Sequence, residues 1–285
     1  SKFLGGDYDM SINFLERELV ASEKDNLKKL SALIMGQMGD VHERKGDTTK
    51  SLDYLRSALK IAEEIGDRQL CSEIGIKTGT SYLFSGKYSE ALEYYNKTLQ
   101  FAEENKDKFI LLRTLGNIGI VYIFQKDFDK SLYYYKRALE IAREISDKLG
   151  ITRNLHNMAE LYYEMGNFEE ALKCFDESLP ISNEIGWKEG YANNLIYVGY
   201  LMAILGKGDK KEGISLLNNG IEMCNKYNFS RAVPMGISFL GRIYAKENDK
   251  EKAMEMFNKA MKVAEEQNFK KMIDDIKEDI LKLDR

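Results

Sequence analysis

Turn signals recur along this chain at an almost constant spacing of 40 residues. They fall at Gly6-Asp7, Gly46-Asp47, Gly86-Lys87, Lys126-Asp127, Gly166-Asn167, Gly208-Asp209 and Asn248-Asp249. The one exception is the interval before Gly208-Asp209, which is 42 residues long. A repeat of this length predicts a stack of similar units, each too small to bury its own apolar faces.

Small and large residues keep fixed positions around these turns. Seven residues before a turn, or nine at Gly199 because of a two-residue insertion, stand the small residues Gly39, Gly79, Gly119, Ala159, Gly199 and Gly241, and three residues later come His42, Tyr82, Tyr122, Tyr162, Met202 and Tyr244. Beyond the turn lie Ser11, Ser51, Ala91, Ser131, Ala171, Gly213 and Ala253, followed after four residues by Leu15, Leu55, Tyr95, Tyr135, Phe175, Leu217 and Phe257. Small residues let two helices approach and large ones fill the space between them, so each unit is predicted to be two antiparallel helices, A and B.

The composition agrees with an all-α protein and limits the classes of partner that it could bind. The chain has only two prolines, Pro180 and Pro234, and proline is excluded from helix interiors. The formal net charge of −4 argues against nucleic acid or an anionic membrane as the partner, and no run of eighteen apolar residues is present. Three widely spaced cysteines indicate reduced thiols in a cytoplasmic protein.

These alternating small and aromatic positions resemble the tetratricopeptide repeat over nearly the whole chain. The period of 40 residues departs from that family's roughly 34, and we expect the surplus in longer helices and in the B-to-A loops. The variant is similar to the repeats of kinesin light chains, spindle-orientation scaffolds, peptide-pheromone-responsive regulators and the sensors of signalling ATPases of the STAND class. The resemblance implies a right-handed superhelical solenoid.

The predicted architecture is one solenoid domain over residues 1–285, with about six and a half repeats. Residues 1–26 form a half repeat that has helix B only, and residues 269–285 form a capping helix. The six full repeats span 27–67, 68–107, 108–147, 148–187, 188–229 and 230–268. The absence of a first A helix indicates a fragment of a longer protein or a further element that covers the exposed face; a full-length protein that begins with an unpaired helix is the remaining alternative. Pro180 is expected to kink its helix.

Catalytic and metal-binding patterns are missing from the sequence, so we predict no enzyme, no metal site and no cofactor. Of the two histidines, His42 occupies the large-residue position and is expected in the core, and His156 has no nucleophilic partner placed by the repeat. The loop at 206–215 resembles a phosphate-binding loop only superficially, because Ile214 stands where lysine is needed.

The family resemblance implies that the A helices line a concave groove that binds a peptide. The positions that would face it carry Lys77, Arg113, Asn117, Arg153, Asn157, Asn193, Tyr197 and Tyr200. Amides can bond a peptide backbone through donor and acceptor, guanidinium groups can hold carboxylates, and the two tyrosines would add an aromatic wall. The lysine and asparagine pattern of the chaperone-tail clamp is absent.

The sequence therefore predicts a non-enzymatic module that binds a protein or peptide segment, acidic in character, through its groove. An alternative is a sensor or autoinhibitory domain of a multidomain signalling ATPase or transcription regulator, in which the partner is another domain of the same polypeptide. Self-association through the uncapped N-terminal edge is a further alternative.

Overall fold

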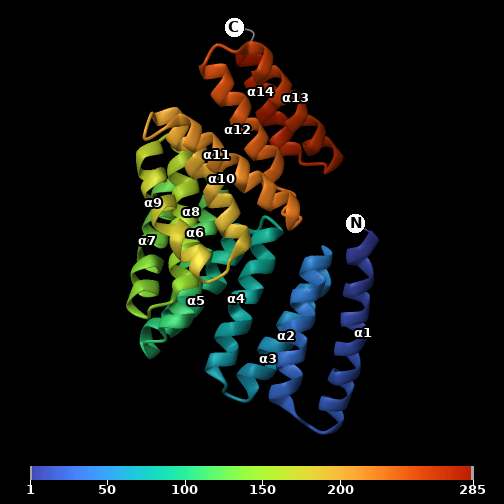
Figure 1. The fold of residues 1–285 in the computed structure, drawn as a ribbon. Coiled ribbons are helices and arrows are strands. Elements are labelled where there is room, and N and C mark those ends of the chain that lie inside the picture. Colours follow the sequence, from blue (N-terminus) through green and yellow to red (C-terminus); the bar gives the residue numbers. More distant parts are fainter. Residues whose placement is uncertain (1, 284–285) are drawn as a thin grey trace. The chain divides into compact units, whose positions relative to one another are not determined.

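A computed structural model describes the backbone of residues 2–283 and the side chains from Tyr8 to Leu283. Within that part, the chain forms fourteen α-helices in antiparallel succession (Figure 1). They are α1 (Lys2–Lys24), α2 (Lys28–Lys45), α3 (Thr48–Glu64), α4 (Arg68–Phe84), α5 (Tyr88–Asn105), α6 (Lys108–Phe124), α7 (Phe128–Glu144), α8 (Lys148–Glu164), α9 (Phe168–Glu184), α10 (Lys188–Leu205), α11 (Lys210–Lys226), α12 (Ala232–Lys246), α13 (Lys250–Glu266) and α14 (Lys270–Leu283). The all-α prediction is confirmed.

The turns between helices follow from two local signals. Asp107 Oδ1 accepts hydrogen bonds from the backbone N–H groups of Phe109 and Ile110, at 3.1 and 3.0 Å, and so caps α6. Gly46 follows α2 with a φ of 85°, a left-handed conformation that glycine adopts without steric cost. Before α3 and before α6, a left-handed residue that ends one helix (Gly46 or Lys106) and an aspartate that starts the next (Asp47 or Asp107) together make a turn of two residues.

The small and large positions meet within each hairpin, as predicted. A Cβ added at Gly79 of α4 would lie 2.6 Å from Tyr95 Cε1 of α5, and one added at Gly119 would lie 2.8 Å from Tyr135 Cε1. The rings of Tyr95 and Tyr135 are fully buried. At Gly79 and Gly119, therefore, only glycine permits this approach of helix A to the tyrosine of helix B.

Next to the contact between the small and large positions, a pair of stacked rings recurs in the first three full hairpins. His42 stacks on Tyr54 with centroids 5.4 Å apart, and Tyr122 stacks on Tyr134 at 5.5 Å. Tyr82 and Tyr94 form the same pair at 5.6 Å. His42 is buried, as expected for a residue in the large-residue position.

Two expectations from the sequence are corrected. Gly6-Asp7 is not a turn, because α1 is one helix from Lys2 to Lys24; a glycine inside a helix weakens it by about 1 kcal/mol without ending it. The longer period also does not reside in the B-to-A loops. Only residues 65–67 separate α3 from α4, and both helices have 17 residues, so the added length lies in the helices.

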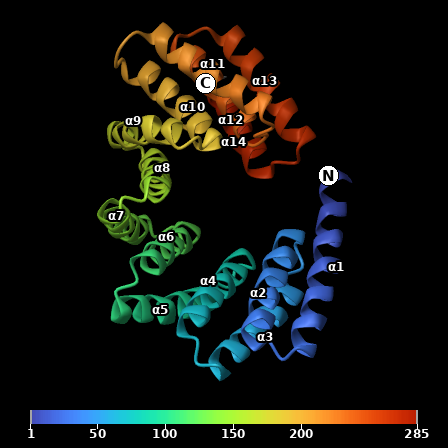
Figure 2. The same cartoon turned by 60° about the horizontal axis from the view of Figure 1, so that its bottom comes forward.

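The internal contacts divide the chain into two compact units, residues 1–141 and 142–285. In the first unit the A helices α2, α4 and α6 contact one another in succession, and in the second α8, α10, α12 and α14 do the same. Figure 2 shows the hairpins that make up each unit. Each unit thus has a surface formed by consecutive A helices, which we call its A-helix face.

Candidate functional site

All eight residues predicted to line the groove lie on A helices, but they divide between the two units. Lys77 belongs to α4, and Arg113 and Asn117 to α6, in the first unit. The second unit holds Arg153 and Asn157 on α8 and Asn193, Tyr197 and Tyr200 on α10. The site is therefore described as two separate faces.

On the first face, one predicted residue is engaged and two are open. The Lys77 ammonium forms an ion pair with Asp40 of α2, which neutralises its charge. Arg113 is exposed and Asn117 is half-buried, and neither makes a hydrogen bond or ion pair with the described residues. Arg113 and Asn117 therefore keep all their donors, and Asn117 its acceptor, for a ligand.

On the second face, one predicted residue contacts an aromatic ring, and two others have amide groups without hydrogen-bond partners. The Arg153 guanidinium carbon is 6.0 Å from the centroid of Trp187, close enough for a cation–π contact. Half-buried Asn157 makes no hydrogen bond with the described residues. Asn193 Oδ1 is buried and has no hydrogen-bond partner. A buried acceptor without a partner costs free energy until some donor reaches it.

The prediction of an open aromatic wall is wrong, because Tyr197 and Tyr200 are only 6% and 7% exposed. Tyr197 stacks on Phe175 of α9 with centroids 4.6 Å apart, and Tyr200 stacks on Phe239 of α12 at 4.2 Å. Burial raises the pKa of both phenols. These rings pack neighbouring helices together. The burial of Tyr197 and Tyr200 could have been predicted from the aromatic residues Tyr163 and Phe239, which lie in the preceding and following A helices.

A polar cluster that sequence reasoning missed lies on the same face. Arg242 Nε donates to Asp279 Oδ2 of α14 at 2.7 Å, and an Arg242 amino group donates to the Tyr163 hydroxyl at 2.8 Å. Burial lowers the pKa of Arg242, but the Tyr163 hydroxyl and the Asp279 carboxylate together raise it well above its usual value. The capping helix is thus held by a largely buried ion pair.

A buried hydrogen-bond network around His156 was also missed. Asn194 Nδ2 donates to Ser178 Oγ at 2.9 Å, so Asn194 Oδ1 is the acceptor for His156 Nδ1, 2.8 Å away. His156 Nε2 lies 3.5 Å from Glu160 Oε1. Burial lowers the pKa of His156, but Glu160 and Asn194 raise it more, so the pKa is above its usual value.

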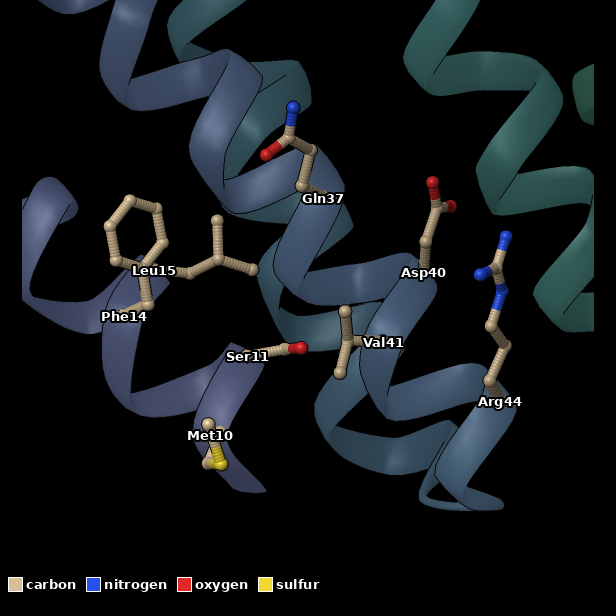
Figure 3. Close-up of a pocket in the computed structure, with 8 residues that line it drawn as sticks. All are labelled: Met10, Ser11, Phe14, Leu15, Gln37, Asp40, Val41 and Arg44. Carbon is tan, nitrogen blue, oxygen red and sulfur yellow. The ribbon is translucent and has the colours of Figure 1, made fainter. Parts of the chain in front are cut away.

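A shallow, open cavity lies elsewhere, between α1 and α2 of the first unit (Figure 3). Its volume is about 540 Å³. Met10, Phe14 and Leu15 line it from α1, and Gln37, Val41 and Arg44 line it from α2. It is an open, mostly apolar hollow outside the predicted groove.

Other functional features are few in the described part of the chain. No group of three or more His, Cys, Asp and Glu side chains is placed to hold a metal ion there. No described helix is both long and apolar enough to cross a membrane. None of the three cysteines forms a disulfide.

Sequence comparison identifies the repeats that build these faces. Residues 30–104 and 110–184 match the tetratricopeptide repeat, and residues 238–267 match it again. The chain belongs to the tetratricopeptide repeat family. Repeats of this family form protein–protein interaction modules and are generally non-catalytic. Among curated proteins, none matches the chain.

Solved structures with the same repeat architecture come from several kinds of protein. BtubC (BKLC) from P. vanneervenii is 18% identical with a TM-score of 0.68, and the match covers 78% of this chain and 92% of that one. The STAND protein with a tetratricopeptide repeat sensor from Pyrococcus horikoshii is 17% identical with a TM-score of 0.72, and the match covers 89% of this chain. This chain spans only 39% of that protein's length.

A third similar structure contains a bound partner. A Rap protein in complex with competence and sporulation factor is 13% identical with a TM-score of 0.63, and the match covers 96% of this chain and 85% of that one. At these identities the likeness concerns the repeat fold.

Proposed function

We propose that this tetratricopeptide repeat chain binds an extended segment of a partner protein on one of its two A-helix faces, in the cytoplasm. The observation that carries the proposal is the set of polar groups left without partners on those faces. They are Arg113 and Asn117 in the first unit, and Asn157 and the buried Asn193 Oδ1 in the second. A peptide backbone offers an N–H and a C=O at each residue, which matches the donor and acceptor of each asparagine amide.

The helices supply affinity by holding these groups in place before the partner arrives. Side chains on packed helices lose little conformational entropy on binding, so the cost of ordering falls mainly on the partner. Arg113 and Arg153 favour a segment with carboxylates, because guanidinium and carboxylate groups form paired hydrogen bonds. Lys77, already paired with Asp40, adds little to this preference.

The test uses peptides selected from a random twelve-residue display library against the wild-type chain. Affinities are then measured for Asn117→Ala, in the first unit, and for Asn157→Ala, in the second, as separate variants. The matched controls are Asn96→Ala and Asn218→Ala, which remove the same group from exposed positions on the B helices α5 and α11 of the respective units. Losing the two hydrogen bonds of one amide should cost about 2 kcal/mol, a roughly thirtyfold loss of affinity for a peptide bound on that unit. A loss no larger than that of the control in both units would reject the A-helix faces as the site.

A second candidate is a sensor domain whose ligand regulates a linked domain. It is supported by the STAND protein, in which the similar repeats are a sensor and this chain would account for only 39% of the length. The test is nucleotide hydrolysis by the full-length gene product with and without a selected peptide. A peptide-dependent change in rate supports the sensor role, and an unchanged rate at saturating peptide rejects it.

A further inference from the structure

The turn that leads into α10 lacks the residue that caps the three A helices before it. Asp67, Asp107 and Asp147 start α4, α6 and α8, and each side chain accepts a hydrogen bond from a backbone N–H of the first turn. The same position before α10 is Trp187, whose side chain makes no capping hydrogen bond. This turn therefore has a large aromatic ring where its neighbours have a stabilising cap.

A glycine makes room for this ring beside the second A-helix face. A Cβ added at Gly190 would overlap the indole of Trp187, so only glycine permits the ring to lie there. The equivalent positions of α4 and α6 hold the larger residues Leu70 and Ile110. The indole is half-buried, and the guanidinium carbon of Arg153 lies over it, 6.0 Å from the ring centroid. Trp187 and Gly190 thus provide an aromatic surface for the Arg153 side chain.

The guanidinium on this surface keeps its hydrogen-bond donors for a ligand. Arg153 is exposed and forms no hydrogen bond or ion pair with the described residues. An aromatic ring attracts a cation over its face and leaves the N–H groups of the guanidinium free to hold a carboxylate by two hydrogen bonds. Arg113, at the equivalent position of α6 on the first face, forms no cation–π contact within the described part of the chain.

A buried acceptor without a partner stands at the position equivalent to Arg153 on the adjacent A helix, α10. It is Asn193 Oδ1. The next residue, Asn194, accepts the hydrogen bond of His156 Nδ1 at 2.8 Å, and this bond joins α10 to α8 at the same level. Asn157 follows His156 in α8, and its amide makes no hydrogen bond with the described residues. The two helices therefore hold a guanidinium, an amide and an unsatisfied acceptor close together.

We propose that Trp187 is a positioning residue for a carboxylate-binding site formed by Arg153, Asn157 and Asn193 on the second A-helix face. The ligand is a segment of a partner protein that carries an aspartate or glutamate, whose side-chain carboxylate binds the Arg153 guanidinium. A backbone N–H beside that acidic residue donates to Asn193 Oδ1, and Asn157 binds the adjoining peptide group. The inference rests on the proposed function and selects the second face over the first.

The peptides selected against the wild-type chain are the probes, and the single tryptophan reports which face they occupy. Binding of peptides that contain no tryptophan is measured by calorimetry and by the fluorescence of Trp187. The variant Arg153→Gln is compared with Arg113→Gln, the matched change on the first face. Each peptide is measured again with its aspartates and glutamates replaced by asparagine and glutamine.

Two variants of Trp187 separate the aromatic surface from the cap. Trp187→Ser supplies a capping side chain without a ring, and Trp187→Phe keeps a ring without a cap. The readout is the ratio of the affinities for the acidic peptide and its amide form, because a general loss of structure lowers both affinities together. Circular dichroism checks the helix content of both variants.

The expected result is a preference for carboxylate that depends on Arg153 and on the ring. Binding should change the emission of Trp187, and the amide peptide should bind the wild type about tenfold more weakly than the acidic one. Arg153→Gln and Trp187→Ser should abolish this tenfold preference, whereas Arg113→Gln and Trp187→Phe should keep it.

The inference is overturned if peptides bind without changing the emission of Trp187 and lose affinity with Arg113→Gln or Asn117→Ala but not with Arg153→Gln. The proposed function would then stand, with the first face as its site. A carboxylate preference that survives Trp187→Ser also overturns it. If no peptide binds, or if neither Asn117→Ala nor Asn157→Ala weakens binding more than its control, the proposed function fails and this inference fails with it.

Discussion

His156 Nδ1 lies 2.8 Å from Asn194 Oδ1, and this bond determines where the histidine proton resides. Because Asn194 uses its amino group on Ser178, its oxygen must accept, so Nδ1 carries a proton. A neutral ring would then point the Nε2 lone pair at the Glu160 carboxylate, 3.5 Å away. The geometry therefore favours the doubly protonated imidazolium, in agreement with the raised pKa of His156.

The first prediction concerns stability against pH in the second unit. A raised folded-state pKa means that protonated His156 stabilises the fold below its ordinary value of about 6.5, and that this contribution is lost as pH rises through the folded-state pKa. The gap in stability between wild type and His156→Gln should therefore shrink as pH rises above about 6.5. This pH-dependent change in the stability difference should be about 1 kcal/mol, because the Glu160 side chain is 46% exposed and its charge is screened. The fluorescence of Trp187, the single tryptophan, reports urea unfolding.

His42 supplies the control, with the opposite sign. Burial lowers its pKa more than the nearby Asp47 raises it, so the folded state resists protonation and loses stability as pH falls through about 6.5. His42→Gln should therefore make the first unit less sensitive to acid. The same pH dependence for both histidine variants would contradict these assignments.

The second prediction compares two neighbouring asparagines of α10. Asn194 is fully buried with two hydrogen bonds, so Asn194→Leu leaves the buried His156 Nδ1 without its acceptor and removes the donor to Ser178 Oγ, and should cost about 2–3 kcal/mol. Asn193 Oδ1 is buried without a partner, so Asn193→Leu should be neutral or stabilise by up to about 1 kcal/mol. Urea unfolding followed by the fluorescence of Trp187 measures the stability of both variants. A loss of peptide affinity in Asn193→Leu without a loss of stability would link this residue to binding.

The repeat was predictable because its signals are local in sequence. Gly79 meets Tyr95 within one hairpin, 16 residues apart, and each hairpin repeats the same contact, so the spacing alone predicted helix pairs and their core. The contact between Gly79 and Tyr95 can be predicted from the sequence of one hairpin, without reference to the other repeats. The same local reasoning failed at Gly6-Asp7, where a turn signal lies inside a continuous helix.

Side-chain exposure on the A-helix faces was less predictable, because it depends on more than one hairpin. Tyr200 is buried by Phe239, which belongs to the next A helix. Arg242 reaches Tyr163 across 79 residues of sequence and Asp279 across 37. Family position indicates which residues face the A-helix side, but whether they remain open depends on the size of their neighbours in adjacent repeats.

The third prediction tests the close approach of helices at Gly79. The Cβ of Gly79→Ala would lie 2.6 Å from Tyr95 Cε1, and the fully buried ring has no room to move, so the cost should be about 1–3 kcal/mol. Gly36→Ala is the matched change in the same unit. Its Cβ would meet Ile74 and Lys77 at 3.9 Å, an ordinary contact, and should gain up to about 1 kcal/mol from helix propensity. Thermal unfolding by circular dichroism compares them; similar effects of the two substitutions would refute the packing argument.

The fourth prediction concerns how the capping helix α14 is held. Asp279→Asn keeps the shape of the side chain but removes the counter-charge of Arg242, which is 30% exposed, while Asp279 is 11% exposed. Because the pair is largely buried, opening of α14 should become easier by about 2 kcal/mol, less than for a fully buried pair. Amide hydrogen exchange in α14 should then be roughly thirtyfold faster, with α8 and α9 unchanged. Glu278→Gln is the control, because that exposed carboxylate forms an ion pair with Lys282 of the same helix and, among the described residues, forms none with Arg242. If both substitutions speed exchange equally, α14 is held by its apolar contacts and not by Arg242.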